Sequence, residues 1–361
     1  MFIINRIVFV FNSIAILALL AAYLAPYLSP DLLWPIAFLG LAFPIIVLVN
    51  VLFIIYWACF LNMKFLFSLA AIVIGWNNMA KFVQFGKNQG SQQIDNSIKV
   101  VTFNARYFGV LDGNPTDDSD IFEDKLDKIN PDILCFQEMF IVHDVPENQI
   151  QQLIKRKYKS YNKANIKATD TKWNCDNIGI LSRYPIIKQG IVEHDSNTFN
   201  YTVFADVVAF GDTIRIINTH LQSIKFESRE YEAVKEISLE ANKEKVSTYK
   251  GIISKMKYAF LMRAKQTDAI EQFISESPYK IIVCGDFNDS PLSYAYRTIK
   301  GDMKDAFMEA GSGLGRTYVG KMPSFRIDYI MGDDQFEFFD YYSKAFSFSD
   351  HKMVSCSVKL R

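Results

Sequence analysis

The chain has 361 residues, half of them hydrophobic, and carries 39 basic and 39 acidic side chains. This balance argues against a protein that coats nucleic acid, because such a protein needs excess positive charge to displace phosphate counterions. The five cysteines show no zinc-ligand spacing and no disulfide framework, so we expect them to pack as small apolar residues.

Residues 1–86 are expected to form a membrane region. Two runs contain no Asp, Glu, Lys or Arg, one from Ile7 to Pro30 and the other from Leu32 to Met63. Each exceeds the length of about 20 residues that a helix needs to cross a hydrocarbon core. Phe65 to about Phe85 is a weaker third candidate, since it contains Asn77, Asn78 and Lys81, although Lys81 lies near an end where its side chain could reach the interface. A buried core hairpin or a signal peptide is the alternative, but the second run is too long for a signal peptide.

The few charges around these runs predict an orientation. Arg6 precedes the first run, Asp31 lies between the first two, and Lys64 separates the second from the third. The positive-inside rule then places the amino terminus in the cytoplasm. With three spans, the protein is a multi-pass cell-membrane protein with an extracytoplasmic carboxy-terminal domain. If the third segment only lies on the membrane, the domain is cytoplasmic.

A polar stretch at residues 87–97 is expected to be a linker, and residues 98–361 are enough for one globular domain. This domain begins with strand-like runs that alternate with few helices. In chain order we expect a strand at Lys99–Phe103, a helix at Asp120–Ile129, and strands at Pro131–Phe136 and Asn177–Ser182. A hairpin follows, in which Tyr201–Phe210 and Thr213–Asn218 are joined at Gly211-Asp212. A long charged helical stretch then runs from Ser223 to Ser275. The part from Ser223 to Phe260 is either an amphipathic flap against a bilayer or a surface helix packed on the domain.

Three polar clusters finish the chain, each at the edge of a strand-like segment. They are Gly285-Asp286-Phe287-Asn288, Arg326-Ile327-Asp328-Tyr329 and Ser349-Asp350-His351. Carboxylates, amides and imidazoles gathered at one rim suit metal-assisted hydrolysis of a phosphoester, because they can take a proton, hold a water and offset phosphorane charge. Taken singly, each residue could also be an ordinary turn or cap residue.

The order of these strand-end residues resembles the endonuclease/exonuclease/phosphatase superfamily, the DNase I-like hydrolases. The matching pieces are Thr102-Phe103-Asn104, Gln137-Glu138, Asn177 to Pro185, Thr219-His220-Leu221 and the three terminal clusters. The resemblance implies an α+β domain of two packed, mostly antiparallel β-sheets flanked by helices, a DNase I-like four-layer sandwich. Here that domain would follow the amino-terminal transmembrane helices.

The resemblance also implies a divalent metal site. Glu138 is similar to the family's principal Mg²⁺ ligand, with Asn104 close by and Asp350 as a further contact. Mg²⁺ favours a few hard oxygen ligands, and Mn²⁺ is the alternative ion.

The implied catalytic residues are Asp286, Asn288, His351, Asp328 and His220. Asp286 would activate the attacking water, and Asn288 would steady the phosphate or the water. His351 would face the phosphate with its tautomer set by Asp328, and His220 would be a second imidazole donor. The inferred reaction is in-line attack of water on phosphorus.

The histidine at position 220 bears on the substrate. The abasic-site repair branch of the family is expected to have a tyrosine in this part of the site, whereas the DNase I, sphingomyelinase and inositol phosphatase branches use a histidine. DNA repair is also an odd task for a membrane-spanning chain. We therefore expect a phospholipid or sphingolipid headgroup as substrate, with a tethered non-specific nuclease and a phosphomonoesterase as alternatives. A non-enzymatic alternative is a membrane-anchored scaffold that has lost catalysis. The sequence leaves the oligomeric state open.

Overall fold

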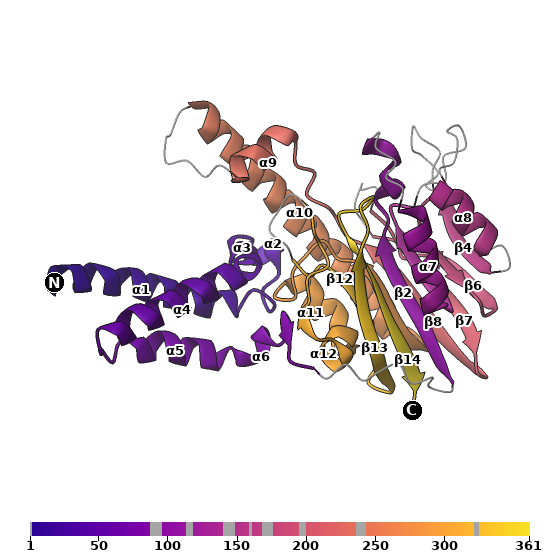
Figure 1. Cartoon of the computed structure of the whole chain (residues 1–361), viewed down its shortest axis with the longest axis horizontal. Coiled ribbons are helices and arrows are strands. Elements are labelled where there is room, and N and C mark those ends of the chain that lie inside the picture. The colour runs from indigo at the N-terminus through magenta and orange to yellow at the C-terminus, as the bar shows by residue number, and fades with distance from the viewer. Residues whose placement is uncertain are drawn as a thin grey trace.

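Two six-stranded sheets pack face to face at the centre of the computed structural model (Figure 1). The structure describes residues 2–86, 96–112, 118–139, 149–158, 161–167, 176–194, 200–235, 243–320 and 325–361. Most of the expected linker at 87–97 lies outside these residues.

The first sheet has the strand order β10-β12-β9-β8-β7-β6. Neighbouring strands are antiparallel except β8 and β9, which run parallel. The strands are β6 (Ile186–Ile191), β7 (Thr202–Ala209), β8 (Asp212–His220), β9 (Lys280–Asp286), β10 (Lys304–Asp305) and β12 (Asp328–Gly332). The hairpin expected at Gly211-Asp212 is β7–β8, and Gly211 has the positive φ of +87° that such a turn requires.

The second sheet has the order β13-β14-β2-β3-β5-β4, with β2 and β3 as its parallel pair. Its strands are β2 (Ser97–Asn104), β3 (Ile133–Gln137), β4 (Asn162–Lys167), β5 (Asp176–Ser182), β13 (Phe336–Ala345) and β14 (Lys352–Leu360). Side chains alternate along each strand, so that Val100 lies in the core between the sheets while Val101 and Phe103 face the outer helices. Both sheets are mixed and mostly antiparallel, which confirms the expected fold class.

Helices cover both outer faces (Figure 1). Helices α7 (Ser119–Ile129) and α8 (Gln149–Lys157) bury their apolar sides on the second sheet. Helices α10 (Lys243–Ser275) and α11 (Tyr294–Lys300) cover the first sheet. The expected helical stretch from Ser223 to Ser275 contains α9 (Ser228–Lys235) and α10. The remaining short elements are η1 (Arg106–Asp112), α12 (Ala306–Ala310), β1 (Val83–Gln84) and β11 (Gly313–Leu314).

The amino-terminal helices form a bundle that projects from one side of the sheets (Figure 1). They are α1 (Phe2–Ala22), α2 (Pro30–Leu33), α3 (Pro35–Leu41), α4 (Phe43–Cys59), α5 (Phe65–Ile74) and α6 (Trp76–Met79). Among the described residues, Ile3–Ala22 is the helix that is long and apolar enough to cross a membrane or to act as a signal sequence. The amino terminus and the α4–α5 turn lie at the end of the bundle far from the sheets.

Two expected spans differ from simple straight helices. The run Leu32–Met63 is broken by a bend of 67° between α3 and α4, and the two pieces reach spanning length only together. A proline in the first turn of α4 lacks the N–H that would continue the helix from α3. The third candidate, Phe65–Phe85, gives only the 10-residue helix α5, followed by α6 and the short strand β1. Helix α5 is about half the length that crosses a hydrocarbon core.

The bundle also contacts the loop that follows β9. Leu292 is fully buried in the same apolar cluster as Leu19 and Phe43 of the bundle. The hydroxyl of Ser290 donates to the carbonyl oxygen of Gly40 at 3.3 Å. The loop is therefore packed directly on the bend between α3 and α4.

Candidate active site

The predicted site residues meet at one rim because of strand direction. Parallel pairing of β2 with β3 places Asn104 opposite Gln137, next to Glu138, and parallel pairing of β8 with β9 places His220 opposite Asp286. Carboxyl ends of parallel strands open on the same edge of a sheet. Strand β12 runs the other way, so its first residue, Asp328, pairs with Asp286 at this edge.

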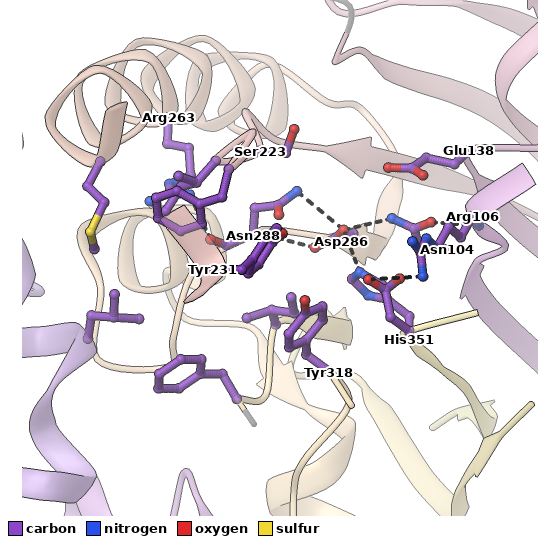
Figure 2. Close-up of a pocket in the computed structure, with 17 residues that line it drawn as sticks. Asn104, Arg106, Glu138, Ser223, Tyr231, Arg263, Asp286, Asn288, Tyr318 and His351 are labelled. Carbon is purple, nitrogen blue, oxygen red and sulfur yellow. Dashed lines mark hydrogen bonds and ion pairs between the residues drawn. The ribbon is translucent and has the colours of Figure 1, made fainter. Parts of the chain in front are cut away.

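Asp286 is the centre of the hydrogen-bond network (Figure 2). One carboxylate oxygen accepts from Asn104 Nδ2 at 2.9 Å, and the other accepts from the backbone N–H of Asn288 at 2.8 Å. The Nε2 atoms of His220 and His351 each lie 3.7 Å from Asp286 Oδ2. Burial raises the pKa of Asp286, and the nearby His351 partly opposes the rise. Asp286 is therefore a fixed, buried carboxylate between two imidazoles.

His351 is held by Asp328. Its Nδ1 lies 3.1 Å from both carboxylate oxygens of Asp328, and its backbone N–H donates to Ser349 Oγ at 3.0 Å. Burial alone would lower the pKa of His351, but attraction to Asp328 and Asp286 outweighs it and raises the pKa to about 10. The ring is thus fixed in orientation with Nε2 directed at Asp286, and it is cationic at neutral pH.

Glu138 and His220 face each other across the rim. Glu138 Oε1 lies 3.7 Å from His220 Nε2, and the Glu138 side chain keeps 22% of its surface exposed. Glu138 has a positive φ of +48°, which turns its side chain out of line with β3. Burial raises the pKa of Glu138 and lowers that of His220. The Nε2 of His220 is buried and has no hydrogen-bond partner among the described residues.

The three residues predicted to bind metal line the same cavity. These residues are Asn104, Glu138 and Asp350. The Oδ2 atom of Asp350 also lies 3.8 Å from a guanidinium nitrogen of Arg106. A second group of donor atoms, from Asp286, Asp328 and His351, lies within 4.8 Å of one another. Both oxygens of Asp328 already face His351 Nδ1, however, so the carboxylate of Glu138 remains the oxygen donor that best fits a hard cation.

The cavity has a volume of about 280 Å³ and includes residues that the sequence did not single out. Arg263, from α10, is almost fully buried and donates to the carbonyl oxygens of Asn288 and Gln222. Its Nε lies 3.2 Å from Asp289 Oδ2. Arg263 therefore holds the loop that carries Asn288, whose φ of +51° is unusual for a residue with a side chain.

The side of the cavity away from Glu138 is apolar and aromatic. The ring of Tyr318 lies edge-on to His351, with centroids 5.3 Å apart, and Tyr231 projects from α9 over the centre of the site (Figure 2). Apolar side chains complete this wall: Leu41, Ile224, Phe226, Met256, Phe325 and Ile327. Leu41 belongs to α3, so the amino-terminal bundle contributes directly to the cavity.

The structure brings all eight predicted site residues together. Six of them line the cavity, namely Asn104, Glu138, Asp286, Asn288, Asp350 and His351. His220 and Asp328 are buried directly behind them. The residues that were missed, such as Arg263 and Leu41, lie in helices whose sequence pattern is that of ordinary packing.

Comparison with known proteins identifies the family of the domain. A model of the endonuclease/exonuclease/phosphatase family matches residues 101–351. A second model, described as a domain of unknown function, matches residues 5–82. No curated protein matches the chain.

Several solved structures share the fold at low identity. The human nocturnin catalytic domain has 15% identity and a TM-score of 0.53, with 75% of this chain and 96% of that chain covered. A humanized D. rerio TDP2 has 15% identity and a TM-score of 0.51, with coverage of 73% and 100%. A family protein from Leptotrichia buccalis has 14% identity and a TM-score of 0.52, again with coverage of 73% and 100%. From the family match over residues 101–351, together with this fold, the chain belongs to the endonuclease/exonuclease/phosphatase family.

Proposed function

We propose that this protein is a membrane-anchored phosphodiesterase that hydrolyses a phospholipid or sphingolipid headgroup. Family membership makes the chain a phosphoester hydrolase. The observation that carries the lipid assignment is the division of the cavity into a polar half around Asp286 and an apolar half that includes Leu41 of the bundle. A diester that joins a charged headgroup to an apolar tail matches both halves.

Each polar residue has a role in this reaction. The carboxylate of Asp286 accepts the proton of the attacking water, and the Asn288 amide orients that water or a phosphate oxygen. His351 and His220 donate to the phosphate as negative charge develops on its oxygens. The products are a phosphomonoester and an alcohol, and protonated His351 would supply the proton to the leaving oxygen.

Glu138 and Asn104, with Asp350 nearby, would hold a divalent cation, for which Mg²⁺ is the proposed ion. This cation would supply positive charge beside the phosphate. The fit rests on the donor set, because the hard side-chain oxygens of Glu138, Asn104 and Asp350 all line one cavity.

Attachment to a membrane is supported by the surface and the interior of the bundle. Many large apolar side chains of α1 are exposed, among them Ile7, Phe11 and Leu17, and a bilayer would cover them. Inside the bundle, Asn12 donates to Ser68 at 2.6 Å and accepts from the Trp57 indole at 2.9 Å. These bonds tie α1 to α4 and α5, which favours a retained helix over a cleaved signal peptide.

The same layout supports an extracytoplasmic catalytic domain. Arg6 and Lys64 lie near the end of the bundle far from the sheets (Figure 1). Basic residues are retained on the cytoplasmic side, so the sheets would lie on the other side. Helix α5 is short, and α6 extends it toward the domain.

A hydrolysis panel tests the proposal. The full chain in nanodiscs would receive sphingomyelin, glycerophospholipids, glycerophosphocholine, inositol phosphates and single- and double-stranded DNA, each with Mg²⁺ and beside Asp286→Asn as the inactive control. We expect lipid diesters to be cleaved in preference to glycerophosphocholine, which has a headgroup without acyl chains. Preference for DNA would replace the lipid assignment by a tethered nuclease.

A substitution in the apolar wall of the cavity tests the lipid assignment separately. Leu41→Ser should lower kcat/KM for the lipid by about tenfold, the usual scale for an apolar contact in a binding pocket. It should lower glycerophosphocholine hydrolysis less. The matched control is Leu24→Ser, which changes an exposed leucine of the same bundle outside the cavity.

A further inference from the structure

The first half of α10 projects from the sheets and packs on α9 as an arm (Figure 1). Helix α10 has 33 residues and is therefore about 50 Å long. Its second half covers the first sheet. We refer to α9 and residues 243–260 of α10 as the α9–α10 arm.

One face of α10 packs on α9 within the arm. Lys255 Nζ lies 2.7 Å from Glu230 and 3.3 Å from Glu227, both at or near α9. The Tyr249 hydroxyl reaches the carbonyl oxygen of Ala233 at 3.4 Å. Met256 lies on this inner side and lines the active-site cavity. These contacts hold α10 against α9.

The opposite face of α10 is exposed. Its residues are Val246, Ser247, Lys250, Ile253, Ser254, Lys257 and Tyr258. Spacings of three and four residues place them on one side of the helix, and we call this set the α10 stripe. It combines apolar side chains with lysines, and the sequence from 246 to 258 contains no Asp or Glu. Neither Lys250 nor Lys257 forms an ion pair with another described residue.

The stripe leads onto the part of the bundle nearest the sheets. Lys257 Nζ lies 5.1 Å from the centroid of the Trp34 ring, and Phe260 packs edge-on against Phe38 at 5.0 Å. Beside Trp34, the side chains of Leu32 and Leu33 are exposed. Tryptophan with exposed leucines at the end of an apolar bundle is typical of a membrane–water interface. The α10 stripe thus continues the surface on which a bilayer would end.

We propose that the α10 stripe docks on the surface of an anionic phospholipid bilayer. Lysines and apolar side chains on one helical face are the combination that binds lipid headgroups, with the lysines attracted to anionic lipid. The absence of acidic residues from the stripe disfavours a second copy of this basic surface as its occupant. The inference rests on the membrane attachment proposed above. Docking would seat the arm, whose inner side carries Tyr231 and Met256, beside the lipid that supplies the substrate.

A spin label tests this contact without using activity. Ser254→Cys places the label within the stripe, and Ser275→Cys, exposed at the other end of α10, is the matched control. Both are made in the full chain with Cys59→Ser and Cys175→Ser, in nanodiscs of phosphatidylcholine with or without phosphatidylglycerol. We expect the Ser254→Cys label to become accessible to oxygen and protected from a water-soluble nickel complex when phosphatidylglycerol is present. The Ser275→Cys label should stay aqueous in both lipids.

Neutralising the lysines should reverse the effect. Lys250→Gln with Lys257→Gln should lower the docked-to-free ratio by about 30-fold, since each lysine near an anionic surface contributes about 1 kcal/mol. A label at position 254 that stays aqueous in both lipids overturns the proposal. So does a label–label distance that reports a second copy on the stripe.

A separate measurement distinguishes failure of the arm from failure of the anchor. Full chain that resists carbonate extraction from vesicles while its Ser254→Cys label stays aqueous overturns the arm alone. Full chain that carbonate extracts overturns membrane attachment and the docking proposal together.

Discussion

Gly285 precedes Asp286 at a point where the backbone leaves no room for a side chain. Its φ is +135°, and a Cβ added there would lie 1.9 Å from the carbonyl oxygen of Thr219. Thr219 is its partner in the parallel pairing of β8 with β9. In Gly285→Ala the two strands must therefore separate at the residues next to His220 and Asp286.

The size of the effect follows from this geometry. A side chain in this region of φ costs about 1–3 kcal/mol, and a weakened ladder hydrogen bond adds about 1 kcal/mol. The sum of about 2–4 kcal/mol corresponds to a fall in Tm of about 5–15 °C for a domain of this size. A displacement of about 1 Å at the adjacent His220 and Asp286, the proposed catalytic residues, should lower kcat/KM on the order of 100-fold.

Hydrolysis of bis(p-nitrophenyl) phosphate and thermal unfolding of the full chain in detergent measure both effects. Gly211→Ala is the matched control, because Gly211 also has a positive φ but lies at the far end of β8, where a Cβ added to it would meet no atom within 4 Å. It should lose only about 1 kcal/mol and keep its activity. A Gly285→Ala protein with the activity and Tm of the wild type would refute the reasoning.

Three further predictions concern the proposed metal ligand Glu138, a buried ion pair and the contact with the bundle. Glu138→Gln should lower kcat/KM on the order of 100-fold and abolish the stimulation of activity in a Mg²⁺ titration. Its Tm should be unchanged or raised, because burial disfavours the charged carboxylate. A wild-type Mg²⁺ response in this variant would contradict the prediction. Asp305→Asn should cost about 3–5 kcal/mol in urea unfolding, because it leaves Arg326 buried without the carboxylate 2.7 Å away. Burial alone would raise the pKa of Asp305, but the charge of Arg326 outweighs burial and lowers this pKa. The wild type therefore keeps the stability contributed by the ion pair above about pH 4 and loses it as the pH falls further. The unfolding free energy of Asp305→Asn should not show this loss at low pH. Gly40→Ala would place a Cβ 2.3 Å from the carbonyl oxygen of Leu292, in the loop that follows β9. It should therefore slow hydrolysis of lipid and soluble diesters alike when the two are measured side by side. An effect on lipid alone would argue against transmission through the loop.

The strand ends of the catalytic domain could be predicted because their signal is local. Apolar runs of four to eight residues stop at polar side chains, and this marks Asn104, Glu138, His220 and Asp286 without any knowledge of neighbours. The order of these positions along the chain then indicated the family, which the match over residues 101–351 confirms. The roles of the individual site residues remain predictions.

The apolar character of residues 1–86 was equally plain, but their shape was not. Hydropathy records composition and not direction, so a run such as Leu32–Met63 has the same signature whether it is one straight helix or the pair α3 and α4 bent by 67°. Hydropathy likewise does not give the length of α5, which depends on how the following residues pack where the chain meets the domain.

The sequence alone determined the kinds of side chain that end the strands, since a polar residue after an apolar run is a property of adjacent positions. Only the tertiary structure decided which distant residues complete the cavity. Leu41 and Arg263 line the cavity from elements far away in the chain, and nothing in their neighbours distinguishes them from other packed residues. The physical reason is that strand endings follow from local burial, whereas a cavity wall depends on how whole helices dock against one another.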